Sequence, residues 1–142
     1  MPEFQIMNSY ILLLIILPLL IYSTITDIYY RTIPLWFCAV EFVLLVAAHW
    51  LLKLGWLLFL SHIVSAAILF CTMLVAALFS GGGGDCILMG LVGLAIGLRR
   101  GLIALILSCV LMTLYYFLTG RKKQTYPMAP FVLAGVIIAC LI

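Results

Sequence analysis

Long apolar runs follow one another along almost the whole sequence and are separated only by short polar or glycine-rich stretches. Hydrophobic residues make up 68% of the 142-residue chain and charged residues only 8%. A soluble domain has roughly a quarter charged residues. A chain of this length cannot bury so much apolar surface in its own interior, so the sequence predicts an integral membrane protein.

The apolar runs predict an all-α fold, a polytopic membrane protein with six transmembrane helices. The expected spans cover residues 10–26, 34–52, 56–79, 86–98, 102–119 and 126–142. Pro18 lies inside the first span and is expected to kink it. The fourth span has about 13 residues, which is short against the roughly 20 that a membrane crossing needs.

Charge and cysteine usage exclude several classes of site. The seven basic residues are scattered between the apolar runs and give a net charge of only +3, which does not fit a nucleic-acid surface. The five cysteines lie in or beside the apolar runs and form no CxxC or CxxxC pair, so the sequence predicts no metal site.

The first apolar run lacks a basic flank and a cleavage site, so we expect a retained helix rather than a signal peptide.

Acidic residues are rare, and two of them stand at the ends of apolar runs. Asp85 directly follows four consecutive glycines, Gly81–Gly84, where the fourth span begins. Asp27 opens a short polar connection, Asp27–Pro34, between the first two spans. Glu41 lies inside the second expected span. Because an acid within or beside a membrane span is costly, these acids are candidates for function.

The expected topology brings the two aspartates to one membrane face, because helices two and three form a round trip between them. That face carries four basic residues, which are Arg31, Arg121, Lys122 and Lys123. The opposite face carries three, which are Lys53, Arg99 and Arg100. The positive-inside rule therefore narrowly places the aspartates on the cytoplasmic face. His49 and His62 are expected near the other end of the helices, away from Asp85.

Two neighbouring aspartates support acid–base chemistry without a cofactor. Two carboxyl groups a few ångströms apart share a proton, so one acts as a base while the other acts as an acid. Such a pair can activate a water molecule against a peptide carbonyl. The glycines before Asp85 permit close approach of backbones at this point. The sequence contains no HExxH, GxSxG or Walker A pattern for a competing chemistry.

Three motifs resemble those of the type IV prepilin peptidases, which are membrane aspartyl proteases of the GxGD class. Gly82–Asp85 matches the GxGD motif, and Asp27–Pro34 resembles the family's first aspartate motif, an acid followed by an arginine and Ile-Pro. Tyr126–Pro130 resembles the proline-containing start of the family's last helix. The resemblance covers essentially the whole chain, in the expected order.

The resemblance implies a single integral-membrane peptidase domain over residues 1–142, in the inner membrane, with its active site facing the cytoplasm. Asp27 and Asp85 would be catalytic, and Gly82, Gly84, Arg31 and Pro34 would support them. No metal or organic cofactor is implied. The substrate would be the short basic leader of a pilin or pseudopilin precursor, cut just before its apolar helix.

The resemblance also bears on other partners and on a second activity. Membrane lipids are the other expected partners, and a homo-oligomer is left open. Larger family members carry a CxxC-containing insertion linked to N-methylation, which this sequence lacks. Peptidase activity alone is therefore implied, as in the short enzymes of Tad/Flp-type pilus systems.

Alternative interpretations remain for the acids and for the whole chain. Asp85 could cap a helix N-terminus, and Asp27 could pair with Arg31 four residues on. Glu41 could be structural or could assist the aspartates. The chain could be a related GxGD protease of the preflagellin type. It could instead be a transport or assembly subunit that uses an intramembrane acid as a proton or cation site.

Overall fold

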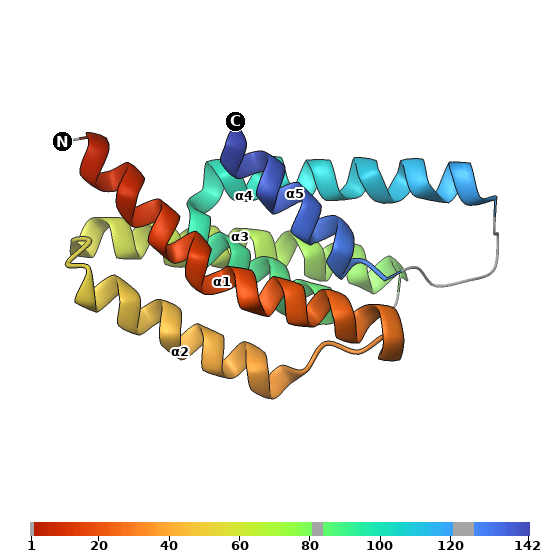
Figure 1. Cartoon of the computed structure of the whole chain (residues 1–142), viewed down its shortest axis with the longest axis horizontal. Helices are drawn as coiled ribbons and strands as arrows, with labels where there is room; N and C mark the ends of the chain where they lie inside the picture. The colour runs from red at the N-terminus through yellow and green to blue at the C-terminus, as the bar shows by residue number, and fades with distance from the viewer. Residues whose placement is uncertain (1, 81–83, 121–126) are drawn as a thin grey trace.

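The computed structural model describes residues 2–80, 84–120 and 127–142, which form α-helices and no strands (Figure 1). The helices are α1 (Pro2–Tyr30), α2 (Leu35–Leu51), α3 (Trp56–Ser80), α4 (Gly84–Thr119) and α5 (Ala129–Leu141). The prediction of an all-α fold is confirmed for these residues. Gly82 and the basic cluster Arg121–Lys123 lie outside the described residues.

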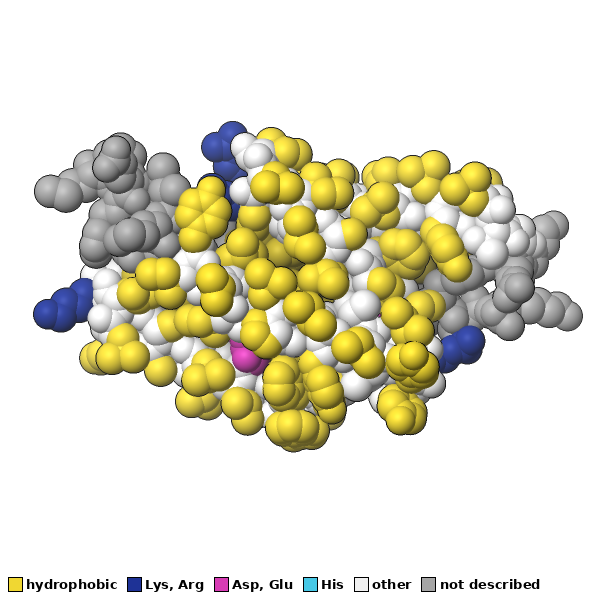
Figure 2. All heavy atoms as spheres, in the orientation of Figure 1, with side chains coloured by type: hydrophobic (Ala, Val, Ile, Leu, Met, Phe, Trp, Pro, Cys, Tyr) yellow, Lys and Arg dark blue, Asp and Glu magenta, His cyan; other side chains and the backbone are white. Residues whose placement is uncertain are grey.

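Three of the described helices are long and apolar enough to cross a membrane. The segments are Tyr10–Tyr30, Trp56–Leu78 and Gly84–Thr119. Helices α2 and α5 are also apolar but have only 17 and 13 residues. Apolar side chains cover most of the face shown in Figure 2, with basic side chains at its periphery. These features support a membrane protein, but six separate spans are not confirmed.

The fourth and fifth predicted spans are joined in α4, which is broken at Gly97. Gly97 has φ 77° and ψ 177°, a conformation outside the helical region that glycine adopts without a Cβ penalty. The first arm of α4 (residues 84–96) runs along α3, and the second arm (residues 98–119) turns back from it (Figure 1). The predicted spans 86–98 and 102–119 thus correspond to the two arms, and the turn lies at Gly97, one residue before the predicted end of the fourth span.

Helix α4 forms the centre of the bundle, and the other four helices pack against it. Small residues permit the closest approaches. A Cβ on Gly93 would lie 2.9 Å from the Ser65 carbonyl oxygen of α3, and one on Gly135 would lie 2.5 Å from the Ala104 carbonyl oxygen. Close contact through glycine is the usual way in which membrane helices pack, because lipid supplies little hydrophobic driving force.

The first helix is longer than the sequence predicted, and this changes the position of Asp27. Helix α1 ends at Tyr30, so Asp27 lies in its last turn and not in the connection that follows. The Arg31 N–H donates to the Asp27 carbonyl oxygen at 3.1 Å, and Arg31 then adopts φ 53°, which ends the helix. Only residues 31–34 connect α1 to α2, and Pro34 occupies the N-cap position of α2.

Candidate active site

Three helix ends that are distant in sequence meet at one end of the bundle. They are the last turn of α1 with Asp27, the first turn of α4 with Asp85, and the first turn of α5 with Ala129 (Figure 1). The two predicted aspartates meet here, Asp27 from α1 and Asp85 from the central helix α4. This end of the bundle is the candidate active site.

Asp27 is buried and held by a backbone donor from the last helix. Its side chain is 8% exposed, and its Oδ2 accepts a hydrogen bond of 2.9 Å from the Ala129 N–H. The first N–H groups of a helix have no partner within the helix, so the carboxylate satisfies one of them. This bond fixes both the orientation of Asp27 and the start of α5.

The role of Ala129 was not predicted from the sequence. Pro127 and Pro130 were noted only as part of a motif. Proline near the first turn marks a helix N-terminus, and such a terminus offers free backbone donors. That signal could have identified the start of α5 as a partner for an acid, although not which acid.

Asp85 lies in the first turn of α4 and is half-buried. Asp27 and Asp85 lie near enough for their charges to interact. Two carboxyl groups at such close range can share a proton. Asp85 is also more exposed than Asp27.

Gly84 allows the first arm of α4 to lie against the connection between α1 and α2. A Cβ on Gly84 would lie 3.3 Å from both Cβ and Cδ1 of Ile33. Ile33 precedes Pro34 and follows Arg31, so this contact links the first aspartate motif to the second. The glycine before Asp85 is therefore a packing requirement that sets how close Asp85 comes to Asp27.

The remaining predicted supporting residues have local backbone roles. The Pro34 carbonyl oxygen accepts hydrogen bonds from Phe37 and Cys38 at 3.1 and 3.2 Å and so begins α2. Arg31 ends α1 through its left-handed backbone, and its side chain is exposed. Both residues shape the connection beside the aspartates.

The two histidines lie at the opposite end of α2 and α3, as predicted. His49 Nδ1 donates to the Leu45 carbonyl oxygen at 2.8 Å, and His62 Nδ1 donates to the Leu94 carbonyl oxygen at 2.8 Å. Since a carbonyl oxygen only accepts, both Nδ1 atoms carry a proton. The single Nδ1 proton of His62 is therefore shared between the Leu94 carbonyl oxygen and His49 Nε2, which lies 3.1 Å away. His62 thus supplies a donor to the turn that precedes the break at Gly97.

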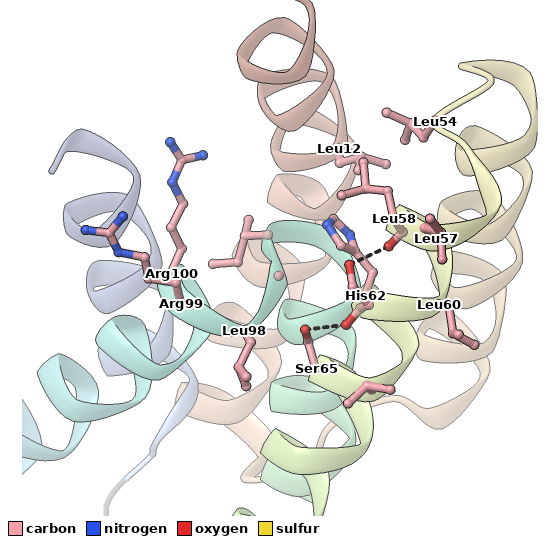
Figure 3. Close-up of a pocket in the computed structure, with 14 residues that line it drawn as sticks. Leu12, Leu54, Leu57, Leu58, Leu60, His62, Ser65, Leu98, Arg99 and Arg100 are labelled. Atoms are coloured by element: carbon pink, nitrogen blue, oxygen red, sulfur yellow. Dashed lines mark hydrogen bonds between the residues drawn. The ribbon is translucent and has the colours of Figure 1, made fainter. Parts of the chain in front are cut away.

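An open cavity of about 620 Å³ lies beside this histidine pair (Figure 3). His62, Gly97, Arg99 and Arg100 line it, together with leucines of α1, α3 and the α2–α3 connection. Within the described ranges, His, Cys, Asp and Glu side chains form no group of three that could hold a metal ion. The cavity is remote from both aspartates and does not belong to the candidate active site.

Glu41 is the third acid of the apolar region and lies in α2. Its side chain is 3% exposed, and among the described residues its Oε1 has no hydrogen-bond partner. It shares the buried face of α2 with Cys38 and Leu45. Nothing in the described contacts connects Glu41 to Asp27 or Asp85.

Comparisons with known proteins identify a family. The family model described as the type IV leader peptidase family matches residues 14–117, a range that includes Asp27 and Asp85. A prepilin leader peptidase/N-methyltransferase of Bacillus subtilis (strain 168) is 33% identical over 134 residues. The alignment covers 89% of this chain but only 54% of that protein, so the chain spans about half the length of this curated relative. No solved structure matches the chain.

Proposed function

The chain belongs to the type IV leader peptidase family, and on this premise we propose that it is a membrane aspartic endopeptidase with Asp27 and Asp85 as its catalytic pair. The observation that carries the proposal is the meeting of the helix ends that hold these two acids, where Asp27 accepts the Ala129 N–H and Gly84, next to Asp85, packs on Ile33. A proton or cation site would need only one of them, whereas peptide hydrolysis by acid–base catalysis needs both.

The surroundings of the two acids divide their roles. Asp27 accepts the Ala129 N–H, so it is the carboxylate that takes a proton from the attacking water. The water oxygen then bonds to the peptide carbonyl carbon. Asp85, half-buried and in its protonated form, donates its proton to the leaving nitrogen as the C–N bond breaks. The products are a free carboxyl group and a free amine, and the pair is restored by exchange with water.

The substrate that we propose is the leader peptide of a pilin or pseudopilin precursor, cut before its apolar helix. The Bacillus subtilis relative is a prepilin leader peptidase/N-methyltransferase, which supports this choice. This chain aligns with about half of that protein, and the activity that we propose for it is the peptidase. A preflagellin-type precursor is the second substrate to test.

The two arms of α4 complete the proposed membrane topology. If each arm crosses or enters the membrane, α1, α2, α3, the two arms and α5 make six crossings. Asp27 and Asp85 then share one face. The narrow excess of basic residues on that face supports a cytoplasmic active site in the inner membrane.

The proposal is tested by cleavage of a co-expressed pilin precursor in membranes. Wild type is compared with Asp27→Asn and Asp85→Asn. Each substitution replaces an acid by an amide of nearly the same shape, and the amide oxygen introduced at position 27 can still accept the Ala129 N–H. We expect wild type to cut and each variant to lose at least about 10³-fold in rate at equal abundance.

Glu41→Gln is the matched control, because it makes the same acid-to-amide change at a buried site in the same membrane region. It should still cut the precursor. Cleavage by either Asp→Asn variant at a rate near that of wild type would overturn the acid pair. A wild type that cuts neither a pilin nor a preflagellin precursor would overturn the substrate assignment.

A further inference from the structure

An apolar groove of about 660 Å³ runs along one side of the bundle between α2 and α3. The first arm of α4 forms its floor, with Ile87, Gly90 and Leu94. Ala39 of α2 and Ala67 of α3 stand on its two walls. We refer to it as the α2–α3 groove.

The groove is open to the side because its two walls are held apart. Helices α2 and α3 are consecutive in the chain and both pack on α4, yet they approach each other mainly at the end that holds His49 and His62. Phe42 and Val43 on the α2 wall are 52% and 63% exposed. In a protein with membrane-spanning helices, such a side opening faces lipid rather than water.

One end of the groove meets the candidate active site. Leu35 lines it and directly follows Pro34, and Ile87 lines it two positions after Asp85. From Ile87 to Leu94 the floor extends about 10 Å along the helix at 1.5 Å per residue. The groove therefore leads from the aspartates into the apolar depth of the bundle.

The lining fits a helix better than a charged peptide. Ala39 and Ala67 are small and exposed, and they allow another backbone to approach closely, as in membrane helix pairs. Gly90 serves the chain's own packing, because a Cβ there would contact Phe70 of α3 at 3.5 Å. The bonds of a helix also satisfy its own backbone, which an apolar groove cannot do.

We infer that the α2–α3 groove docks the apolar transmembrane helix of the substrate, so that the peptide bond preceding that helix lies between Asp27 and Asp85. The inference rests on the proposed function, because it uses the aspartate pair as the point of cleavage. It names the helix as the feature that positions the substrate, and the leader as the part that is released.

Photo-crosslinking tests which molecule occupies the groove. A photoreactive amino acid is placed at Val43 on the groove wall, or at Val75 on α3 outside it, in the Asp85→Asn background with a full-length precursor. The two positions are matched, since they are 63% and 57% exposed. We expect position 43 to label the apolar segment of the precursor at least five-fold more than position 75. Equal labelling, or labelling only of lipid or of a second copy, overturns the inference.

Bulky substitutions test the same groove through activity. Ala39→Trp and Ala67→Trp are assayed on the full-length precursor and on a soluble peptide that ends shortly after the scissile bond. Cleavage of the precursor should fall at least ten-fold more than cleavage of the peptide, while Val75→Trp changes neither. Equal falls for the two substrates, or no fall for either, count against the groove.

The two failures are distinguishable. If wild type cuts the precursor and position 43 fails to label it, the proposed function stands and the groove is wrong. If wild type cuts nothing but position 43 labels the precursor helix, the groove stands as a helix site and the peptidase assignment is wrong.

Discussion

Each end of the first arm of α4 has a glycine, and a pair of polar side chains lies beside that glycine. The two pairs differ in their surroundings. Gly84 precedes Asp85 and faces Ile33, and Asp85 interacts with Asp27. At the other end Gly97 breaks the helix beside His62, which contacts His49. Both glycines let a neighbouring side chain lie close to the backbone of α4, but the polar groups beside them have different surroundings.

The histidine end is satisfied from within the protein. The two rings donate to the carbonyl oxygens of Leu45 and Leu94 and contact each other, and both side chains are buried. The aspartate end has fewer internal hydrogen bonds and is less buried. Asp27 accepts one N–H, and Asp85 is half-buried. Polar groups with internal partners stabilise a fold, whereas a pair of acids with one half-exposed member is available for chemistry. This difference supports the proposal that the histidine end is structural and the aspartate end reactive.

The largest effect should come from Asp27→Ala, which removes both the acid and the acceptor for the Ala129 N–H. We expect activity to fall at least about 10³-fold, as for Asp27→Asn. Unlike Asn, Ala also leaves a buried N–H unsatisfied, which should cost about 1–3 kcal/mol of stability. Thermal unfolding of the purified variants in detergent measures the difference. Equal melting temperatures for the Ala and Asn variants would show that the bond to Ala129 does not hold α5.

Gly84→Val should lower activity by about 10–100-fold, because a misplacement of about 1 Å at a catalytic group has that effect. The added side chain would press on Ile33 and shift Asp85 relative to Asp27, while Gly84→Ala should be milder because Ile33 can give way slightly. Precursor cleavage measures both.

The double variant Gly84→Val with Ile33→Ala is the control for this steric explanation. Shortening Ile33 makes room for the new side chain, so it should recover part of the lost activity. A double variant as poor as Gly84→Val alone would mean that the contact with Ile33 is not what positions Asp85.

Some of these contacts could be predicted from the sequence and others could not. Apolar runs and rare acids predicted an all-α membrane chain and the pair Asp27 and Asp85, because both signals are local or belong to short motifs. The hydrogen bond from Ala129 joins residues 102 positions apart, and no local pattern selects that acid from the others. The end of the fourth span was predicted one residue after the break at Gly97, because charges usually mark the end of a span and Arg99 and Arg100 follow it.

At the histidine end, His62→Phe should affect stability rather than chemistry. It leaves the Leu94 carbonyl oxygen without its donor beside the break in α4, which should cost about 1–2 kcal/mol, or roughly 3–8 °C in melting temperature. Activity per folded molecule should stay within about three-fold of wild type.

His49→Phe is the matched change for this prediction. It should cost less, because Leu45 lies on the same helix and its carbonyl oxygen keeps a place in the regular bonding of α2. A fall in activity for His62→Phe as large as that for Gly84→Val would remove the distinction between the two ends.

The smallest effect is expected for Glu41→Gln, and it sharpens the comparison because Glu41 resembles Asp27 in burial but not in partners. Its side chain is 3% exposed, its Oε1 has no partner among the described residues, and no described contact joins it to either aspartate. A buried acid without a cationic partner is cheapest in its neutral form, and an amide reproduces that form closely. Precursor cleavage should therefore stay within about three-fold of wild type, with a melting temperature within a few degrees. A loss comparable to that of Asp27→Asn would instead make Glu41 a third acid of the active site, and the lack of a described contact with either aspartate would no longer mark a buried acid as structural.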